Sequence, residues 1–198
     1  DLGYELWIDP DHAELLWDRL FQAGELHGIR AMGSRALELL RIEAGFILAG
    51  VDFLPAWEAV RPTHTRSPFE LGLGWLVDFD KGLFNGRQAR LEEKKTGSRS
   101  RLVKLDIDGN KPAKQSFVFT KKGKYAGTVT SAMWSPSAKA SIALASLQAP
   151  LGKPGEEFDV EIYYQRELKW SRVMAPARVV KDVFWDPPRK RMTPPADF

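Results

Sequence analysis

Helix-like and strand-like patterns of apolar positions alternate along the first part of the chain. Residues 4–8 form a short apolar run that predicts a strand, and Asp9-Pro10 supplies an N-cap and a proline suited to a first helical turn. Apolar residues at three-and-four spacing then predict an amphipathic helix ending at Gly24, and a second helix is predicted between Ser34 and Gly45. The apolar faces of these two helices comprise Ala13, Leu16, Trp17, Leu20 and Phe21 in the first, and Leu37, Leu40 and Ala44 in the second.

The next segment reads as a long surface excursion. Residues 50–65 contain two prolines and no clear period, and residues 69–77 are apolar but interrupted by glycines. A charged helix is predicted over residues 85–95, and Thr96-Gly97-Ser98 is the expected domain joint. Loops of this length often border sites.

The second half of the chain is a series of strands. Val103, Leu105 and Ile107 alternate with polar residues, which is the pattern of a half-buried strand. Short β-prone runs separated by Gly, Pro or Lys-Gly turns suggest a small antiparallel barrel or sandwich. The seven predicted runs are residues 103–107, 116–120, 124–130, 141–147, 158–164, 168–174 and 177–182.

The composition excludes several classes of site. The chain of 198 residues is 43% apolar, so it should fold around a real core, and it has no cysteine for a disulfide, a thiolate metal site or a nucleophile. Its three histidines lie far apart, so no metal site is predicted. Because no apolar run approaches the ~18 residues of a spanning helix and no leader is evident, we expect a soluble, cytoplasmic protein. The chain opens at Asp1 in a strand-like segment, which suggests a fragment.

Charge is distributed unevenly. Residues 1–80 hold six Lys/Arg against 14 Asp/Glu, whereas residues 81–198 hold 23 against 12. The excess concentrates in residues 87–124, which we call the basic stretch, with 12 Lys/Arg and four acids. It could form a basic surface for an anionic partner or a solvated polar face.

Ordered motifs resemble those of the folate-dependent aminomethyltransferases, typified by the glycine cleavage T-protein. This family includes dimethylsulfoniopropionate demethylases and the folate domains of dimethylglycine and sarcosine dehydrogenases. The resemblance covers residues 3–191. The matching segments are Gly3-Tyr4-Glu5, Leu40-Arg41-Ile42-Glu43-Ala44-Gly45, Ser67-Pro68-Phe69-Glu70-Leu71-Gly72-Leu73 with Lys81, Phe84 and Gly86, and Gly127-Thr128-Val129-Thr130-Ser131 with Ser135-Pro136.

This resemblance implies an α+β chain in two parts. Residues 1–96 would be the rear part of a tetrahydrofolate-binding α/β domain, residues 97–191 a small antiparallel β-barrel, and residues 192–198 a tail. The front of the folate domain, which carries the family's essential aspartate, has no counterpart here. No catalytic residue is therefore named, and we expect the isolated chain to be inactive.

The resemblance also places candidate folate ligands. Glu5 matches the family glutamate that grips the pterin, whose two adjacent N–H donors suit a carboxylate, and Tyr4 lies beside it. The T-protein's folate-binding arginine falls at Leu37, two positions from Arg35, the nearest arginine and the remaining candidate. Two residues turn a helix by about 200°, so this departure favours a divergent member such as a demethylase.

Three further residues are interpreted as structural near the site. Arg41 and Glu43 sit at a helix end, where a buried ion pair holding helix to loop is the favoured interpretation. Glu70 follows Pro68, a position that fits a cap or a hydrogen bond to loop amides at least as well as a ligand role.

The function implied by the resemblance is a tetrahydrofolate-dependent aminomethyl- or methyltransferase, with a folate-dependent demethylase of a methylated amine or sulfonium compound as the alternative. The partners would be folate, a small one-carbon donor and an acidic carrier protein that the basic stretch could dock, with no membrane. A non-catalytic folate-binding branch is disfavoured because residues 81–88 lack its cysteine. A nucleic-acid-binding module is disfavoured because no RNP-like, helix-turn-helix or zinc motif accompanies the charge.

Overall fold

The computed structural model describes residues 3–192, and their backbone contacts divide the chain into two compact units. One unit comprises residues up to Glu38 together with those from Asp186 onwards, and the other comprises Leu39–Trp185. All but the first residue of the predicted tail, 192–198, lies outside the described residues. The predicted domains, residues 1–96 and 97–191, stay a prediction. The two units describe how the backbone packs and do not assign its parts to a folate-binding domain or a barrel domain.

The first unit contains the predicted first helix but not the predicted strand. Asp9 Oδ1 accepts a hydrogen bond from Asp11 N at 3.0 Å and starts the 3-10 turn η1 (Pro10–His12), which leads into α1 (Ala13–Gly24). A second 3-10 turn, η2 (Glu25–His27), continues to Gly28, which takes the left-handed cap conformation expected at Gly24. Residues 4–8 are exposed and extended without pairing, so the strand prediction was wrong: within the described residues no partner strand lies beside them.

Helix α2 (Ser34–Glu43) ends as predicted at Gly45. Gly45 has φ +73°, and it donates to Ile42 O while Phe46 N donates to Arg41 O at 2.8 Å. These two bonds form the helix-ending Schellman arrangement, which needs the left-handed conformation that glycine adopts without a Cβ penalty. The residues buried at this helix end are Ile42 and Glu43, whereas Leu37 and Leu40 of the predicted apolar face are exposed.

The segment after α2 is a long irregular excursion, as expected. It contains the 3-10 turns η3 (Pro62–His64) and η4 (Gly74–Leu76) and then α3 (Arg87–Thr96), close to the predicted helix 85–95. Gly97, with φ +88°, ends α3 and begins the connection to the strands. One more 3-10 turn, η5 (Pro188–Arg191), lies near the end of the described chain.

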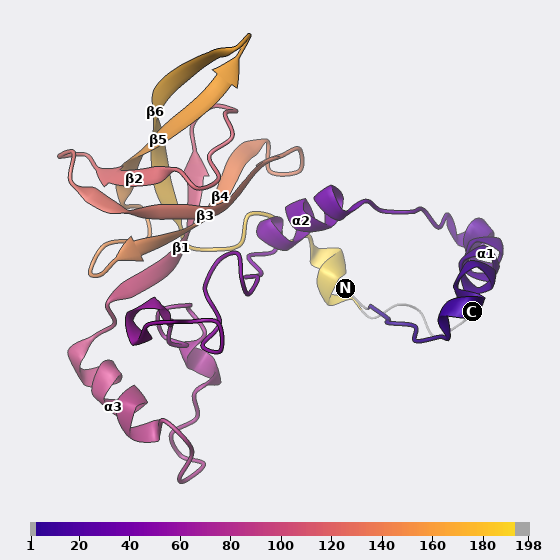
Figure 1. Ribbon diagram of the computed structural model, residues 1–198, viewed down its shortest axis with the longest axis horizontal. Coiled ribbons are helices and arrows are strands. Elements are labelled where there is room, and N and C mark those ends of the chain that lie inside the picture. The colour runs from indigo at the N-terminus through magenta and orange to yellow at the C-terminus, as the bar shows by residue number, and fades with distance from the viewer. Residues whose placement is uncertain (1–2, 193–198) are drawn as a thin grey trace. The chain divides into compact units, whose positions relative to one another are not determined.

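Six antiparallel strands close into a barrel in the order β1-β4-β3-β2-β5-β6, which confirms the α+β class and the predicted small barrel (Figure 1). The strands are β1 (Ser100–Ile107), β2 (Phe117–Thr120), β3 (Tyr125–Ser135), β4 (Ala140–Gln148), β5 (Glu157–Arg166) and β6 (Lys169–Val180). Alternate residues face the interior, so Val103, Leu105 and Ile107 of β1 are buried as their spacing predicted. Burial of such side chains supplies most of the barrel's stability.

Residues 3–192 contain six strands rather than the seven predicted, because the last two predicted runs form one strand. The sequence predicts a break at Pro176, but β6 continues through it, pairing Pro176 with Asp159 of β5. The Pro176 carbonyl faces the β1 side, where it accepts from Asp108 N at 2.8 Å just beyond the end of β1. A strand residue directs its N–H and C=O to the same neighbour. The missing proline N–H therefore falls where the β1 ladder has already ended.

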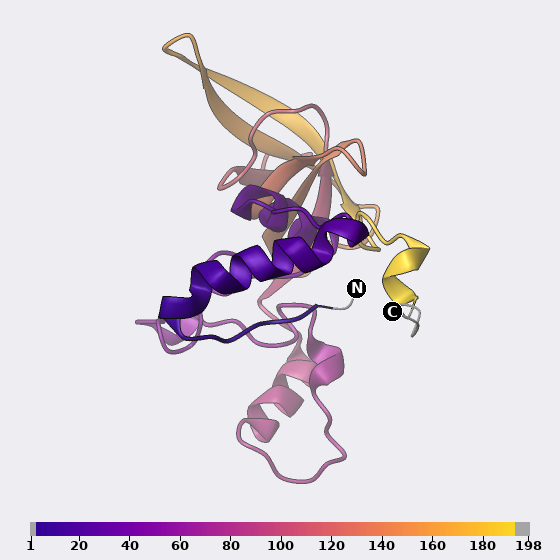
Figure 2. The ribbon, with the colours of Figure 1, turned by 90° about the vertical axis from the view of Figure 1, so that its right-hand side faces the viewer.

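Strands β5 and β6 extend beyond the other strands as a two-stranded ribbon, which stands out in two perpendicular views (Figures 1 and 2). They pair with each other from Glu157↔Arg178 to Arg166↔Lys169. In contrast, β5 pairs with β2 only up to Glu161, and β6 pairs with β1 only from Ala177 onwards. The ribbon between these limits has no regular strand on either edge.

Candidate functional site

The three predicted folate ligands lie in the first unit and are exposed. Tyr4 and Glu5 occupy the extended segment before η1, with 81% of Tyr4 accessible, and Arg35 is the second residue of α2. Nothing in the described residues gathers these three side chains around a cavity. Their ligand roles stay predictions.

A buried polar cluster joins the end of α2 to the barrel within the second unit. Arg41 Nη1 lies 2.5 Å from Asp52 Oδ2, and Arg41 Nη2 donates to Ser131 Oγ at 2.7 Å. Both oxygens of Asp52 are occupied, because Oδ1 also accepts from Thr130 Oγ1 and Ser131 Oγ, and Oδ2 accepts from Leu48 N. The Asp52 side chain is fully buried and that of Arg41 is 11% exposed. The ion pair thus links helix, loop and strand β3 at one point.

Glu43 binds the barrel through a hydrogen bond and not through the ion pair that the sequence predicts. Its Oε1 accepts from Ser135 Oγ at 2.5 Å, and Ser135 Oγ in turn accepts from Ala138 N. The Glu43 carbonyl also accepts from Trp185 N at 3.1 Å, which joins the helix end to the segment that leaves the barrel. Glu43 Oε2 is buried and has no hydrogen-bond partner among the described residues. The ionic partner in this region is Asp52, and it pairs with Arg41.

Residues from separate sequence motifs therefore meet in space. Arg41 and Glu43 come from the Leu-Arg-Ile-Glu-Ala-Gly segment, and their barrel partners Ser131 and Ser135 come from the segments around Thr130 and Pro136. The sequence separations are 90 and 92 residues. These motifs build a junction between α2 and β3.

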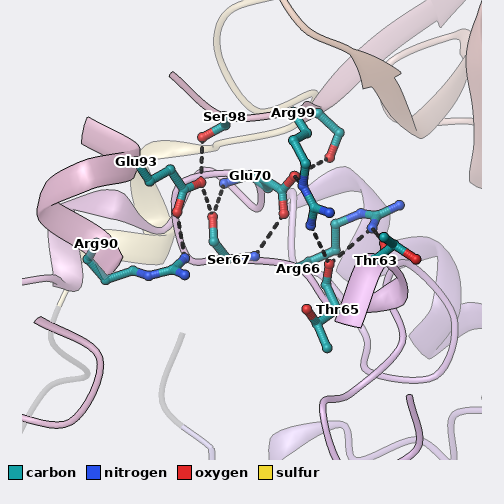
Figure 3. A network of polar contacts seen from close by, with 10 residues as sticks. Thr63, Thr65, Arg66, Ser67, Glu70, Arg90, Glu93, Ser98 and Arg99 are labelled. Carbon is teal, nitrogen blue, oxygen red and sulfur yellow. Dashed lines mark hydrogen bonds and ion pairs between the residues drawn. The ribbon is translucent and has the colours of Figure 1, made fainter. Parts of the chain in front are cut away.

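A second network surrounds the Ser67-Pro68-Phe69-Glu70 turn (Figure 3). Ser67 N donates to Glu70 Oε2 at 3.0 Å, and Glu70 N donates to Ser67 Oγ at 3.1 Å. This reciprocal arrangement is that of a capping box. The other carboxylate oxygen of Glu70 accepts from Ser100 Oγ, and Leu102 N donates to the Glu70 carbonyl, so the turn is fixed to the start of β1.

Glu93 of α3 completes this network. Its carboxylate accepts from Ser67 Oγ at 2.5 Å, from Ser98 Oγ at 2.7 Å and from Arg90 Nη1 at 2.5 Å (Figure 3). Arg99 Nε approaches Glu70 Oε1 at 3.6 Å from the exposed side. The network binds the turn, α3 and β1 together, and it crosses the predicted joint at Thr96-Gly97-Ser98.

Two cavities adjoin these networks. A cavity of about 460 Å³ lies over Asp52 and Thr130 and is also lined by His64 and Arg66, and one of about 680 Å³ is lined by Glu70, Glu93 and their neighbours. Arg66 Nη1 donates to the carbonyls of Thr63 and Thr65. Asp52 and Thr130 at the smaller cavity bond to each other, and Ser67 at the larger cavity bonds to both Glu70 and Glu93. This geometry holds the connected elements in place.

A third polar region lies at one end of the barrel. Burial raises the pKa of Asp106, the charge of Asp108 raises it further, and Arg178 opposes the shift. These residues line a cavity of about 320 Å³ together with Lys121 and Glu157. The described part of the chain contains no cluster of three or more His, Cys, Asp or Glu that could hold a metal ion. Nor is any helix in residues 3–192 long and apolar enough to span a bilayer.

Sequence reasoning missed Asp52, Thr130, Ser131 and Glu93 as members of these networks. The sequence indicated Asp52 only indirectly. A buried Arg41 at a helix end needs a carboxylate partner, and Asp52 is the next acidic residue after Glu43. Nothing in the local pattern indicates that Ser131, 79 residues from Asp52, is the third member of the cluster with Arg41 and Asp52.

Known proteins resemble both parts of the chain. Residues 1–81 match the GCVT N-terminal domain, and residues 100–186 match the glycine cleavage T-protein C-terminal barrel domain. The trimethylamine-oxide aldolase of Ruegeria pomeroyi is 34% identical over 193 residues, which are 96% of this chain and 23% of that protein. The aminomethyltransferase of Synechococcus sp. strain CC9311 is 37% identical over 184 residues, 92% of this chain and 44% of that protein.

A solved structure gives the same fold. The glycine cleavage system aminomethyltransferase T from Bartonella henselae matches with a TM-score of 0.70 and 24% identity, over 88% of this chain and 44% of that one. The chain therefore spans less than half the length of these relatives.

Proposed function

The chain belongs to the glycine cleavage T-protein family, and from that premise we propose that it is the C-terminal part of a tetrahydrofolate-dependent one-carbon transferase. The observation that carries the proposal is the convergence of motif residues, in which Arg41 and Glu43 bind Ser131 and Ser135. Two of the segments that resemble the family thereby join the end of α2 to the barrel. A cytoplasmic location and docking of an acidic carrier on the basic stretch belong to the same proposal.

The candidate ligands suit a reduced folate chemically. Glu5 presents an exposed carboxylate on extended backbone, and two adjacent N–H donors of a pterin edge match its two oxygens. Tyr4 offers a ring beside it, and Arg35 offers a cation for the anionic end of the ligand. A bound tetrahydrofolate would supply the nitrogen that accepts the aminomethyl or methyl group.

The chain's own contribution in this proposal is positioning. Helix α2 carries Arg35 near its start and Arg41 and Glu43 at its end. Buried, hydrogen-bonded charges at the end of α2 fix its last turn to β3. Such support for binding groups is what precise recognition requires.

The test is calorimetry of tetrahydrofolate binding with a chain extended to the full length of its relatives. Glu5→Ala should weaken binding by roughly 1.5 to 3 kcal/mol, the scale of a charge-assisted hydrogen-bond pair. Glu14→Ala, which removes an exposed carboxylate from the same unit, is the matched control. Equal affinities for the two variants would refute the assignment of Glu5.

A folate-dependent demethylase is the second candidate, and two observations favour it. Leu37 stands where the T-protein has its folate-binding arginine, and a relative named for a methylated amine oxide matches 96% of the chain. One-carbon release is measured with a methylated amine and with an aminomethyl-carrier substrate. Release from the methylated amine alone would favour this candidate over the first.

A further inference from the structure

The β5–β6 ribbon carries exposed aromatic side chains on one face. Tyr163 pairs with Arg172 across the ribbon and Gln165 pairs with Trp170, so Tyr163 and Trp170 are diagonal neighbours on the same side. Trp170 is 70% exposed and Tyr163 is 54% exposed. Arg172 lies beside them, held at 2.5 Å from Glu161. These two exposed rings, which we call the platform, lie on one face of a ribbon without a regular strand on either edge.

A cavity of about 470 Å³ opens beside this platform and connects it with the basic stretch. Its aromatic lining comes from Tyr163, Tyr164 and Trp170, and Lys111 and Arg166 add two cations. Lys111, a member of the basic stretch, places Nζ 4.6 Å from the centre of the Tyr164 ring. None of the described residues that line this cavity is acidic.

The remaining lining residues are Pro112 and the two amide-bearing residues Asn110 and Gln165. An amide offers a donor and an acceptor together, which is the pattern needed to read the edge of a nucleobase. The cavity thus brings rings that stack and amides that meet base edges on one face of the ribbon next to Tyr164, Arg166 and Lys111 on its other face, where the cations can meet phosphates.

We propose that the ribbon binds single-stranded nucleic acid, a function distinct from one-carbon transfer. Accessible rings on strands stack with unpaired bases, and neighbouring Lys and Arg side chains follow the phosphates. A duplex hides its base faces, and an acidic polypeptide has no bases to stack, so the exposed rings favour a single strand over either. The sequence alone disfavours this class because the basic stretch lacks a motif, whereas the structure adds aromatic groups from a distant hairpin.

The test is fluorescence anisotropy of labelled 15-mers of deoxythymidine and uridine titrated with the full chain. We expect saturable binding whose affinity falls steeply with salt, because each phosphate contact releases counterions. Trp170→Ala and Tyr163→Ala should each weaken binding about tenfold, and Trp170→Phe, which keeps a ring, should restore most of it. Lys111→Glu should weaken binding and flatten the salt dependence.

Matched controls separate the ribbon from general effects. Trp57→Ala removes another exposed tryptophan and Lys153→Glu reverses another exposed lysine, so both should leave affinity unchanged. Thermal unfolding checks that each variant is folded. Lack of binding at 50 mM salt, equal binding of a duplex, or equal losses from Trp57→Ala and Trp170→Ala would each overturn the proposal.

Discussion

Arg41 and Asp52 form an ion pair in which the aspartate side chain is fully buried and its carboxylate accepts four hydrogen bonds from the helix end, the loop and β3. Taking charges out of water is costly, so such a pair persists only where hydrogen bonds compensate both partners. Asp52 meets this condition with four neighbouring donor groups.

Removal of the Asp52 charge should strongly destabilise the second unit. Asp52→Asn leaves the Arg41 guanidinium buried beside a neutral amide, and loss of one partner of a buried pair costs about 3–5 kcal/mol. Urea unfolding measures the effect. Asp159→Asn, which breaks the exposed pair with Lys121, is the control and should cost less than about 1 kcal/mol. Similar losses for both variants would contradict a special role for the buried pair.

The Ser67–Glu70 cap should be a stability element and not a ligand site. Glu70→Gln replaces an oxygen that accepts from Ser67 N or Ser100 Oγ with an amide that cannot, and we expect a loss of about 1–3 kcal/mol. Thermal unfolding gives this value, with the exposed Glu58→Gln as control. Folate affinity of the extended chain should change less than in Glu5→Ala. A stable Glu70→Gln protein with weakened folate binding would reverse the assignment.

Asp106 should make the barrel less stable as pH rises above the acidic range. Burial raises its pKa in the folded state, so between the ordinary aspartate value of about 3.9 and the raised value only the folded chain keeps the proton. Stability therefore falls across this window and stays lower above it. Asp106→Asn removes the free-energy cost of ionising this carboxyl in the folded state. The midpoint of thermal unfolding of the variant should therefore match that of the parent near pH 3 and exceed it at pH 7. A difference that stays constant from pH 3 to 7 would rule this out.

The turn that connects β5 to β6 should tolerate glycine better than its native residue. Glu167 and Leu168 have φ values of +49° and +65°, and Leu168 is 90% exposed. Left-handed backbone costs a non-glycine residue roughly 1–2 kcal/mol, so Leu168→Gly should raise the free energy of unfolding by about 1 kcal/mol. Lys169→Gly, one residue later in the strand, should lower it. Equal decreases in the free energy of unfolding for the two substitutions would contradict this prediction.

Elements whose evidence is local could be predicted from the sequence. The alternation through Val103, Leu105 and Ile107 fixes which side faces the core, and Gly45 and Gly97 mark helix ends because each needs a left-handed backbone. The apolar run at residues 4–8 failed as a strand because a strand exists only with a partner, and a pattern cannot show whether one is present.

Features that depend on distant residues could not be predicted. Pro176 looked like a strand break because its position relative to the end of β1 is a property of the barrel. The partners of Arg41 and Glu43 could not be named, since Ser131 and Ser135 are 90 or more residues away. The meeting of Lys111 with Tyr164 likewise follows from barrel closure and not from either local segment.

Strand β6 is continuous from the exposed ribbon at Lys169 to the barrel wall at Val180. A two-stranded hairpin alone is marginally stable in water, and here the root of one strand is anchored by Ala177 and Val179 in the core. The ribbon is therefore anchored at its barrel end, and its strand pairing should open first at the turn. Its amides should exchange with solvent in a gradient, fastest at Leu168 and slowest towards Val179, and force applied at the tip would be felt by the barrel seam between β1 and β6.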